Sequence, residues 1–176
     1  MEYSDYELIQ GIRAGDADAL EFLVRRWYSK IFGYALKTLE NEQDAYDITQ
    51  EVFLAVLQNI KTIYPWSQFK SWIFTIAHNK CMDYFRLRRL VAPEDIQDID
   101  TPDPSPLLDD MVTNSLAVEK ALDKLSVPQR EAVVLHYFHQ FTVREIARMT
   151  HTPLPTVKSR LASAKRLLEK FLKEDF

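Results

Sequence analysis

The stretch that decides the fold runs from residue 142 to residue 168 and reads TVREIARMTHTPLPTVKSRLASAKRLL. Its first residues, Thr142-Val143-Arg144-Glu145, have the spacing of a capping box, in which a hydroxyl and a carboxylate close the start of a helix. Thr150-His151-Thr152-Pro153 interrupts the helical pattern, and Pro155 suits the first turn of a second helix that continues to about Leu172. A short helix, a tight turn and a longer basic helix form a helix-turn-helix, whose second helix enters the DNA major groove.

The second of these helices is expected to have two faces. An apolar face, at three- and four-residue steps, should pack on the domain: Val157, Leu161, Ala164, Leu168 and Phe171. The other positions carry short polar groups and cations, which allow close approach to base edges and neutralise phosphates. We predict that DNA is contacted by Arg144 on the preceding helix and by Thr156, Lys158, Ser159, Arg160, Ser163, Lys165 and Arg166. The alternative is a basic helix face that only meets solvent.

Helical spacing of apolar residues continues along the rest of the chain, and sustained alternation of polar and apolar residues is absent. Capping signals are present at Ser4, at Gly15-Asp16, at Asn41 and at Ser126. The sequence therefore predicts an all-α protein with helices over 4–13, 19–39, 44–61, 68–90, 114–125, 126–138, 142–149 and 155–172.

The charge of −4 is unevenly distributed. Residues 92–112 carry seven acidic and no basic side chains, whereas residues 113–176 carry eleven basic and seven acidic ones, a balance of +4. The acidic stretch also contains four of the eight prolines, so it should be extended. We predict two small helical domains, 1–91 and 113–176, joined by a flexible acidic, Pro-rich linker; an ordered surface loop is the alternative for the linker.

Composition excludes several classes of protein. A single cysteine rules out a disulfide scaffold, and the acidic, polar start is unlike a secretory signal. Without a run of about 18 apolar residues, direct membrane insertion is not expected. These features favour a cytoplasmic protein.

These motifs together resemble the sigma factors of bacterial RNA polymerase, of the extracytoplasmic-function (ECF) class. Thr142–Ala147 and Thr156–Leu161 resemble sigma region 4. Gly15–Leu23, Asp44–Phe53 and Phe69–Asn79 resemble successive parts of region 2. His151 and Pro155 depart from the glycines usual in the family, and Phe141 precedes the first helix without a nearby glycine. The resemblance implies a sigma factor that binds the polymerase core, melts the minus-ten promoter element and reads the minus-thirty-five element, with an anti-sigma factor as inhibitor.

One helix of region 2 combines acidic and apolar residues. Such a face suits docking on a partner with basic residues. The resemblance implies that this partner is the polymerase core, and the expected contacts are Asp44, Asp47, Gln50, Glu51, Phe53 and Leu54. The alternative is a solvated acidic helix start near the positive end of the helix dipole.

Aromatic residues and lysines are interleaved over residues 60–72, the chemistry that holds an unpaired DNA strand. Phe69 and Trp72 fall on the helical stripe and are expected in the core, whereas Tyr64 and Trp66 are candidates for exposed contact. By resemblance, the minus-ten contacts are Asn59, Ile63, Tyr64, Trp66, Phe74 and Asn79, with Lys80, Arg86, Arg88 and Arg89 on duplex phosphates.

Other chemistry has little support in the sequence. The pairs His78/Cys81 and His136/His139 have metal-ligand spacing, but they belong to different domains and no second cysteine exists. No nucleophile has a recognisable partner, so neither an enzyme nor a cofactor is expected. The remaining alternative function is a stand-alone helix-turn-helix transcriptional regulator, which would bind duplex DNA without polymerase.

Overall fold

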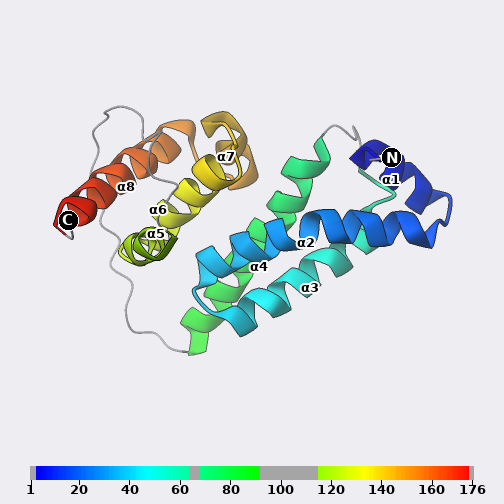
Figure 1. Ribbon diagram of the computed structural model, residues 1–176, viewed down its shortest axis with the longest axis horizontal. Helices are drawn as coiled ribbons and strands as arrows, with labels where there is room; N and C mark the ends of the chain where they lie inside the picture. Colours follow the sequence, from blue (N-terminus) through cyan, green and yellow to red (C-terminus); the bar gives the residue numbers. More distant parts are fainter. Residues whose placement is uncertain (1–2, 64–67, 92–114, 175–176) are drawn as a thin grey trace. The chain divides into compact units, whose positions relative to one another are not determined.

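The computed structural model describes residues 3–63, 68–91 and 115–174 of the chain. All regular secondary structure in these residues is helical, which confirms the all-α prediction (Figure 1). The chain divides into two compact units, Met1–Val91 and Ala92–Phe176, each with its own set of packed helices.

The first unit contains α1 (Asp5–Arg13), α2 (Ala17–Leu39), α3 (Glu42–Asn59) and α4 (Phe69–Val91). Local signals start the first three helices, as the sequence predicted. Ser4 forms a capping box with Glu7, whose pKa is lowered by the hydrogen bonds from the Ser4 amide and hydroxyl. Asp16 accepts from the amides of Asp18 and Ala19 after a turn at Gly15 (φ 90°), and Asn41 accepts from the amide of Asp44.

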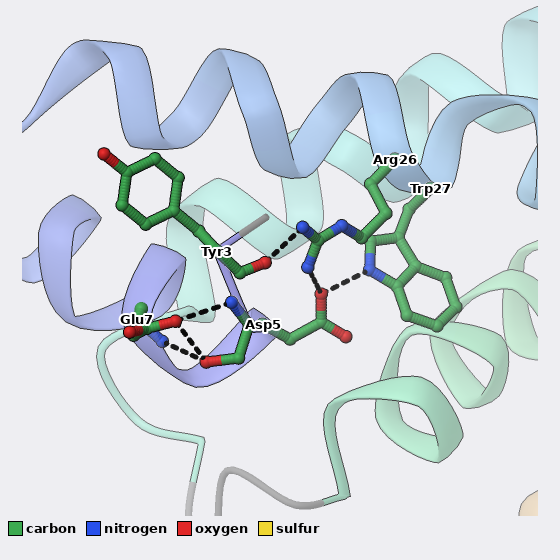
Figure 2. Close-up of polar contacts among 6 residues, drawn as sticks. Tyr3, Asp5, Glu7, Arg26 and Trp27 are labelled. Atoms are coloured by element: carbon green, nitrogen blue, oxygen red, sulfur yellow. Dashed lines mark hydrogen bonds and ion pairs between the residues drawn. The ribbon is translucent and has the colours of Figure 1, made fainter. Parts of the chain in front are cut away.

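A polar cluster fastens the start of α1 to α2 (Figure 2). The Asp5 carboxylate accepts from the guanidinium of Arg26 at 2.7 Å and from the indole Nε1 of Trp27 at 3.2 Å. Arg26 also donates to the carbonyl of Tyr3. Because one carboxylate satisfies two donors on adjacent residues of α2, the position of α1 along that helix is fixed.

Gly11 lets α1 and α2 approach closely. A Cβ at this position would lie 2.8 Å from the Cβ of Ala19, a distance that side chains do not tolerate. The two helices therefore meet through a residue with no side chain and a residue with a single methyl group.

Aromatic side chains form the centre of the first unit. Tyr34 and Phe74 are fully buried, and Phe69 and Trp27 are nearly so. Phe74 meets Tyr34 edge to face at 5.5 Å between centroids, and Trp27 meets Phe69 at 5.7 Å in the same way. The core position expected for Phe69 is confirmed, whereas Trp72 is only half-buried.

The second unit contains α5 (Ser115–Leu122), α6 (Val127–Val133), η2 (Val134–Phe138), α7 (Val143–Met149) and α8 (Leu154–Glu174). Arg130 on α6 is buried and donates to the carbonyls of Leu122 and Leu125, each at 3.0 Å. Its guanidinium thereby ties α6 to the last residue of α5 and to the turn that follows it. Apolar residues of α5, α6, α8 and the turn after α5 form a core cluster: Ala121, Leu122, Leu125, Val133, Ala164 and Leu168.

The helix predicted after Ser126 is present, but its geometry changes halfway along. Residues Val134–Phe138 form a π-helix, and the amide of His139 donates to the carbonyl of Val134 at 3.2 Å. The wider turn rotates the following side chains, so Tyr137 and Phe138 are exposed rather than on the apolar side.

Candidate nucleic-acid and protein interfaces

The helix-turn-helix is built as the sequence predicts. Thr142 and Glu145 form the capping box of α7, with the Thr142 amide donating to the carboxylate at 2.7 Å. His151 in the turn has φ 50°, a left-handed conformation that glycine adopts more easily. Pro155 lies in the first turn of α8. The two departures at His151 and Pro155 are therefore compatible with the turn.

The N-terminal half of α8 presents short polar groups and a cation. Val157 and Ala164 are buried and fix the inner side of the helix, whereas Lys158 is exposed and Ser159 is half-buried. The outer positions match much of the predicted DNA surface: Lys158 and Arg166 are exposed, as is Arg144 on α7, and Thr156, Ser159 and Ser163 are half-buried.

Lys165 differs from the other residues of α8 that are predicted to contact DNA. This residue is only 8% exposed, and its ammonium lies 3.6 Å from the Glu169 carboxylate one turn later. Lys165 follows Leu161 by four positions and Ala164 by one, so it borders the apolar stripe and turns inward. Arg160 is also engaged, because its guanidinium donates to the Thr152 hydroxyl at 3.3 Å. Arg160 therefore supports the turn in this structure.

An acidic and apolar surface runs along α3. Asp47, Gln50 and Glu51 are exposed, and Leu54 is 57% exposed. Asp44 is half-buried, and Phe53 is buried with its ring stacked on that of Tyr28 at 6.1 Å. The surface therefore consists of carboxylates around exposed apolar side chains, with Phe53 as support beneath it.

Two further residues belong to this surface. Tyr46 and Leu57 are 45% and 41% exposed. Leu57 follows Leu54 by three positions and Tyr46 precedes Gln50 by four, so helical spacing alone could have identified both. We call six of the exposed residues of α3, namely Tyr46, Asp47, Gln50, Glu51, Leu54 and Leu57, the α3 surface.

Polar contacts tie α4 to α3 beside the α3 surface. Lys80 pairs with Glu51 at 2.9 Å. The Tyr84 hydroxyl donates to the Asp44 carboxylate at 2.6 Å, and Arg88 donates to the same hydroxyl at 3.4 Å. Burial and the adjacent carboxylate raise the pKa of Tyr84 above its usual value. Residues predicted for the polymerase contact and for DNA contact thus bind each other across two helices.

Several of the residues predicted to contact the minus-ten element are exposed in the structure. Asn79 is exposed on α4, and Asn59 is exposed with its amide donating to the Ala55 carbonyl at 2.8 Å. Arg86 pairs with Asp83 at 2.7 Å, and Arg88 and Arg89 are exposed near the end of α4.

The other predicted minus-ten residues are buried or fall outside the described part of the chain. Phe74 is 0% exposed because it fills the aromatic core, so in this structure its side chain is not open to the DNA contact predicted for it. Ile63 is 6% exposed, so its side chain is not open to the predicted contact either. Tyr64 and Trp66, like the predicted linker at 92–112, lie outside the described residues.

Neither a metal site nor a membrane span is found in the described residues. Within 3–63, 68–91 and 115–174, no group of three His, Cys, Asp or Glu residues could hold a metal ion. Across the same ranges, no helix combines the length and the apolar character needed to cross a membrane.

Comparison with known proteins decides the family. The family model described as Sigma-70 region 2 matches residues 23–90, and the model described as Sigma-70, region 4 matches residues 115–168. The ECF RNA polymerase sigma factor SigM of Mycobacterium tuberculosis (strain H37Rv) is 31% identical, over 97% of this chain and 86% of its own length. The chain belongs to the ECF sigma factors.

A further relative and two solved structures are similar over most of the chain. SigW of Bacillus subtilis is 26% identical, over 99% of this chain and 100% of its own. The sigma factor RpoE of Bartonella quintana, solved in complex with the anti-sigma factor NepR, is 25% identical with a TM-score of 0.69, over 89% of this chain and 98% of its own. CnrH, solved with the cytosolic domain of CnrY, is 25% identical with a TM-score of 0.70, over 98% of this chain and 99% of its own.

Proposed function

We propose that this ECF sigma factor binds the RNA polymerase core and directs promoter-specific initiation of transcription. The observation that carries the proposal is the presence, in one chain, of the α3 surface and of a helix-turn-helix whose α8 exposes Lys158 and Arg166. A stand-alone regulator needs the second feature but has no use for the first. The protein acts as a specificity subunit without catalysis of its own.

The proposed division of labour follows the chain. Residues 1–91 bind the core and recognise and melt the minus-ten element, residues 113–176 read the minus-thirty-five element, and residues 92–112 link them. The two compact units and the positions of the two family matches support this assignment. The proposed place of action is the cytoplasm, where polymerase and DNA meet.

An inhibitory partner is also proposed. The similar RpoE was solved with an anti-sigma factor. The exposed Leu54 and Leu57 of the α3 surface offer the apolar contacts that a protein partner buries. An anti-sigma factor that covers the α3 surface would compete with the polymerase core for it.

The test is co-purification with polymerase core, followed by run-off transcription. The wild-type chain should bind the core and start transcripts at defined promoters. Asp47→Arg should weaken core binding by about ten-fold or more, because the new positive charge repels a basic partner. Asp47 is exposed, so the change removes no buried group. Glu21→Arg is the matched control, since Glu21 is an exposed acid on α2 paired only weakly with Arg25. Tight, specific DNA binding by the isolated chain without core affinity would support the stand-alone regulator instead.

A further inference from the structure

One arginine of α1 holds the segment that follows α3. The Nη2 atom of Arg13 donates to the carbonyls of Ile60 at 3.3 Å and Ile63 at 3.4 Å, and also to that of Lys61. These partners follow Arg13 in the sequence by 47 to 50 positions. A single guanidinium nitrogen thus gathers three backbone carbonyls at the end of another helix.

The segment Ile60–Ile63 requires such a partner. α3 ends at Asn59, so the carbonyls of Ile60, Lys61 and Ile63, which follow it, take no part in the hydrogen bonds of that helix. The Thr62 amide and hydroxyl both bind the Asn59 carbonyl, at 2.9 and 2.7 Å, and leave the next carbonyls to another donor. A cation also complements the negative end of the helix dipole.

The side chains of Ile60 and Ile63 are held by the core of the first unit. Ile60 is 1% exposed and Ile63 is 6% exposed, so the core holds their side chains while Arg13 holds their carbonyls. The attachment of α1 does not depend on Arg13, because Leu8 and Ile9 are buried and Asp5 is bound by α2. The charge of Arg13 therefore acts on the backbone conformation of Ile60–Ile63.

We propose that Arg13 is a positioning residue for minus-ten recognition. It makes no contact with DNA itself. It sets the backbone between Asn59, which is exposed at the end of α3, and the part of the chain that leads to α4. Recognition of an unpaired base requires a preformed pocket, because ordering a loop during capture lowers the affinity. The inference rests on the function proposed above and adds α1 to the parts that determine promoter specificity.

Replacement by glutamine tests this role. Arg13→Gln keeps a donor but removes the cation and the fork of the guanidinium, and Arg13→Lys keeps the charge alone. Arg25→Gln is the control, because Arg25 is an exposed arginine on α2 whose partner is Glu21. Each full-length variant is combined with polymerase core and assayed on a promoter and on the same promoter with single-base changes in the minus-ten element.

The expected results distinguish a positioning role of Arg13 from a role in the stability of the first unit alone. Arg13→Gln should reduce the discrimination between the correct and the altered minus-ten bases by about ten-fold, the effect of losing hydrogen bonds from a charged donor. In Arg13→Gln, core affinity and discrimination at the minus-thirty-five element should stay within about two-fold of wild type, and the same holds for Arg25→Gln. The minus-ten discrimination of Arg13→Lys should lie between that of wild type and that of Arg13→Gln. Hydrogen exchange at the Thr62 amide should become faster in Arg13→Gln, and far less so for amides in α2.

Other outcomes would overturn the inference. Unchanged minus-ten discrimination in Arg13→Gln would show that the contact has no part in recognition. An equal loss on every template together with lower core affinity would show that Arg13 only stabilises the unit. If the wild-type chain fails to bind core and start transcripts, the proposed function fails, and this inference fails with it.

Discussion

The carboxylate of Glu51 on α3 lies 2.9 Å from the ammonium of Lys80 on α4. Glu51 belongs to the α3 surface proposed to meet the polymerase, and Lys80 belongs to the cations proposed to meet DNA. If Glu51 turned to a basic partner, Lys80 would lose its counter-ion and become available to a phosphate. The ion pair would then couple the proposed core binding to the proposed DNA binding.

The energy of this ion pair should be small. The two side chains are 34% and 52% exposed, so solvent screens their attraction. A double-mutant cycle with Glu51→Gln and Lys80→Met, measured by urea unfolding, should give a coupling energy of less than about 1 kcal/mol. The pair Asp83/Arg86, on one helix, is the control and should couple no more strongly. A coupling energy well above that value would contradict the idea that Glu51 and Lys80 readily separate to bind other groups.

From the raised pKa of Tyr84 we expect a loss of stability at high pH. Burial and the Asp44 carboxylate raise its pKa in the folded state above the ordinary 10.0, so the unfolded chain ionises first. Its contribution is complete below pH 10.0 and is lost as the pH rises through the folded-state pKa. Tyr84→Phe should therefore weaken the pH dependence of unfolding above this pH, as measured by urea titration. A slope identical to that of wild type would contradict the contact.

Lys158 should carry sequence recognition by α8. Lys158→Ala should weaken binding at the minus-thirty-five element by about ten-fold and lower the salt dependence, because an exposed cation at the N-terminal half of the helix is removed. Core binding should be unchanged. Lys170→Ala removes an exposed cation near the other end of the same helix and should have little effect. Equal losses in the two variants would point to general charge attraction.

The turn of the helix-turn-helix contains removable strain. His151 has φ 50°, where a Cβ is unfavourable, so His151→Gly should stabilise the turn by roughly 0.5–1 kcal/mol. Hydrogen exchange of the Thr152 amide, which donates to the Ala147 carbonyl at 3.0 Å, should slow accordingly. Gly33→Ala is a contrasting change at a helical glycine with open space around it, and it should leave that amide unaffected. Faster exchange in His151→Gly would contradict the prediction of strain.

Features that depend on neighbouring residues in the chain could be predicted from the sequence. The capping residues Ser4, Asp16, Asn41 and Thr142 all act within three residues, and each begins a helix where its type and spacing indicate. The left-handed turn at His151 follows from the same kind of local reasoning.

Features that depend on distant packing could not be predicted in this way. The π-helix at Val134–Phe138 has no local signal, and the three-carbonyl contact of Arg13 joins parts of the chain that sequence spacing cannot relate. Phe74 and Lys165 lie on helices with predicted DNA contacts, yet both are buried. A rotation of a fraction of a helical turn separates the inside of a helix from the outside, and only the packed structure fixes that rotation.

The contact between Gly11 and Ala19 makes the sequences of two helices depend on each other. A Cβ at position 11 would lie 2.8 Å from the Cβ of Ala19. A larger residue at position 11 therefore requires a smaller one at position 19 or a greater separation of α1 and α2. A greater separation would also move Asp5 away from Arg26 and Trp27. Among ECF sigma factors with this arrangement of α1 and α2, side-chain volumes at these two positions should therefore vary inversely.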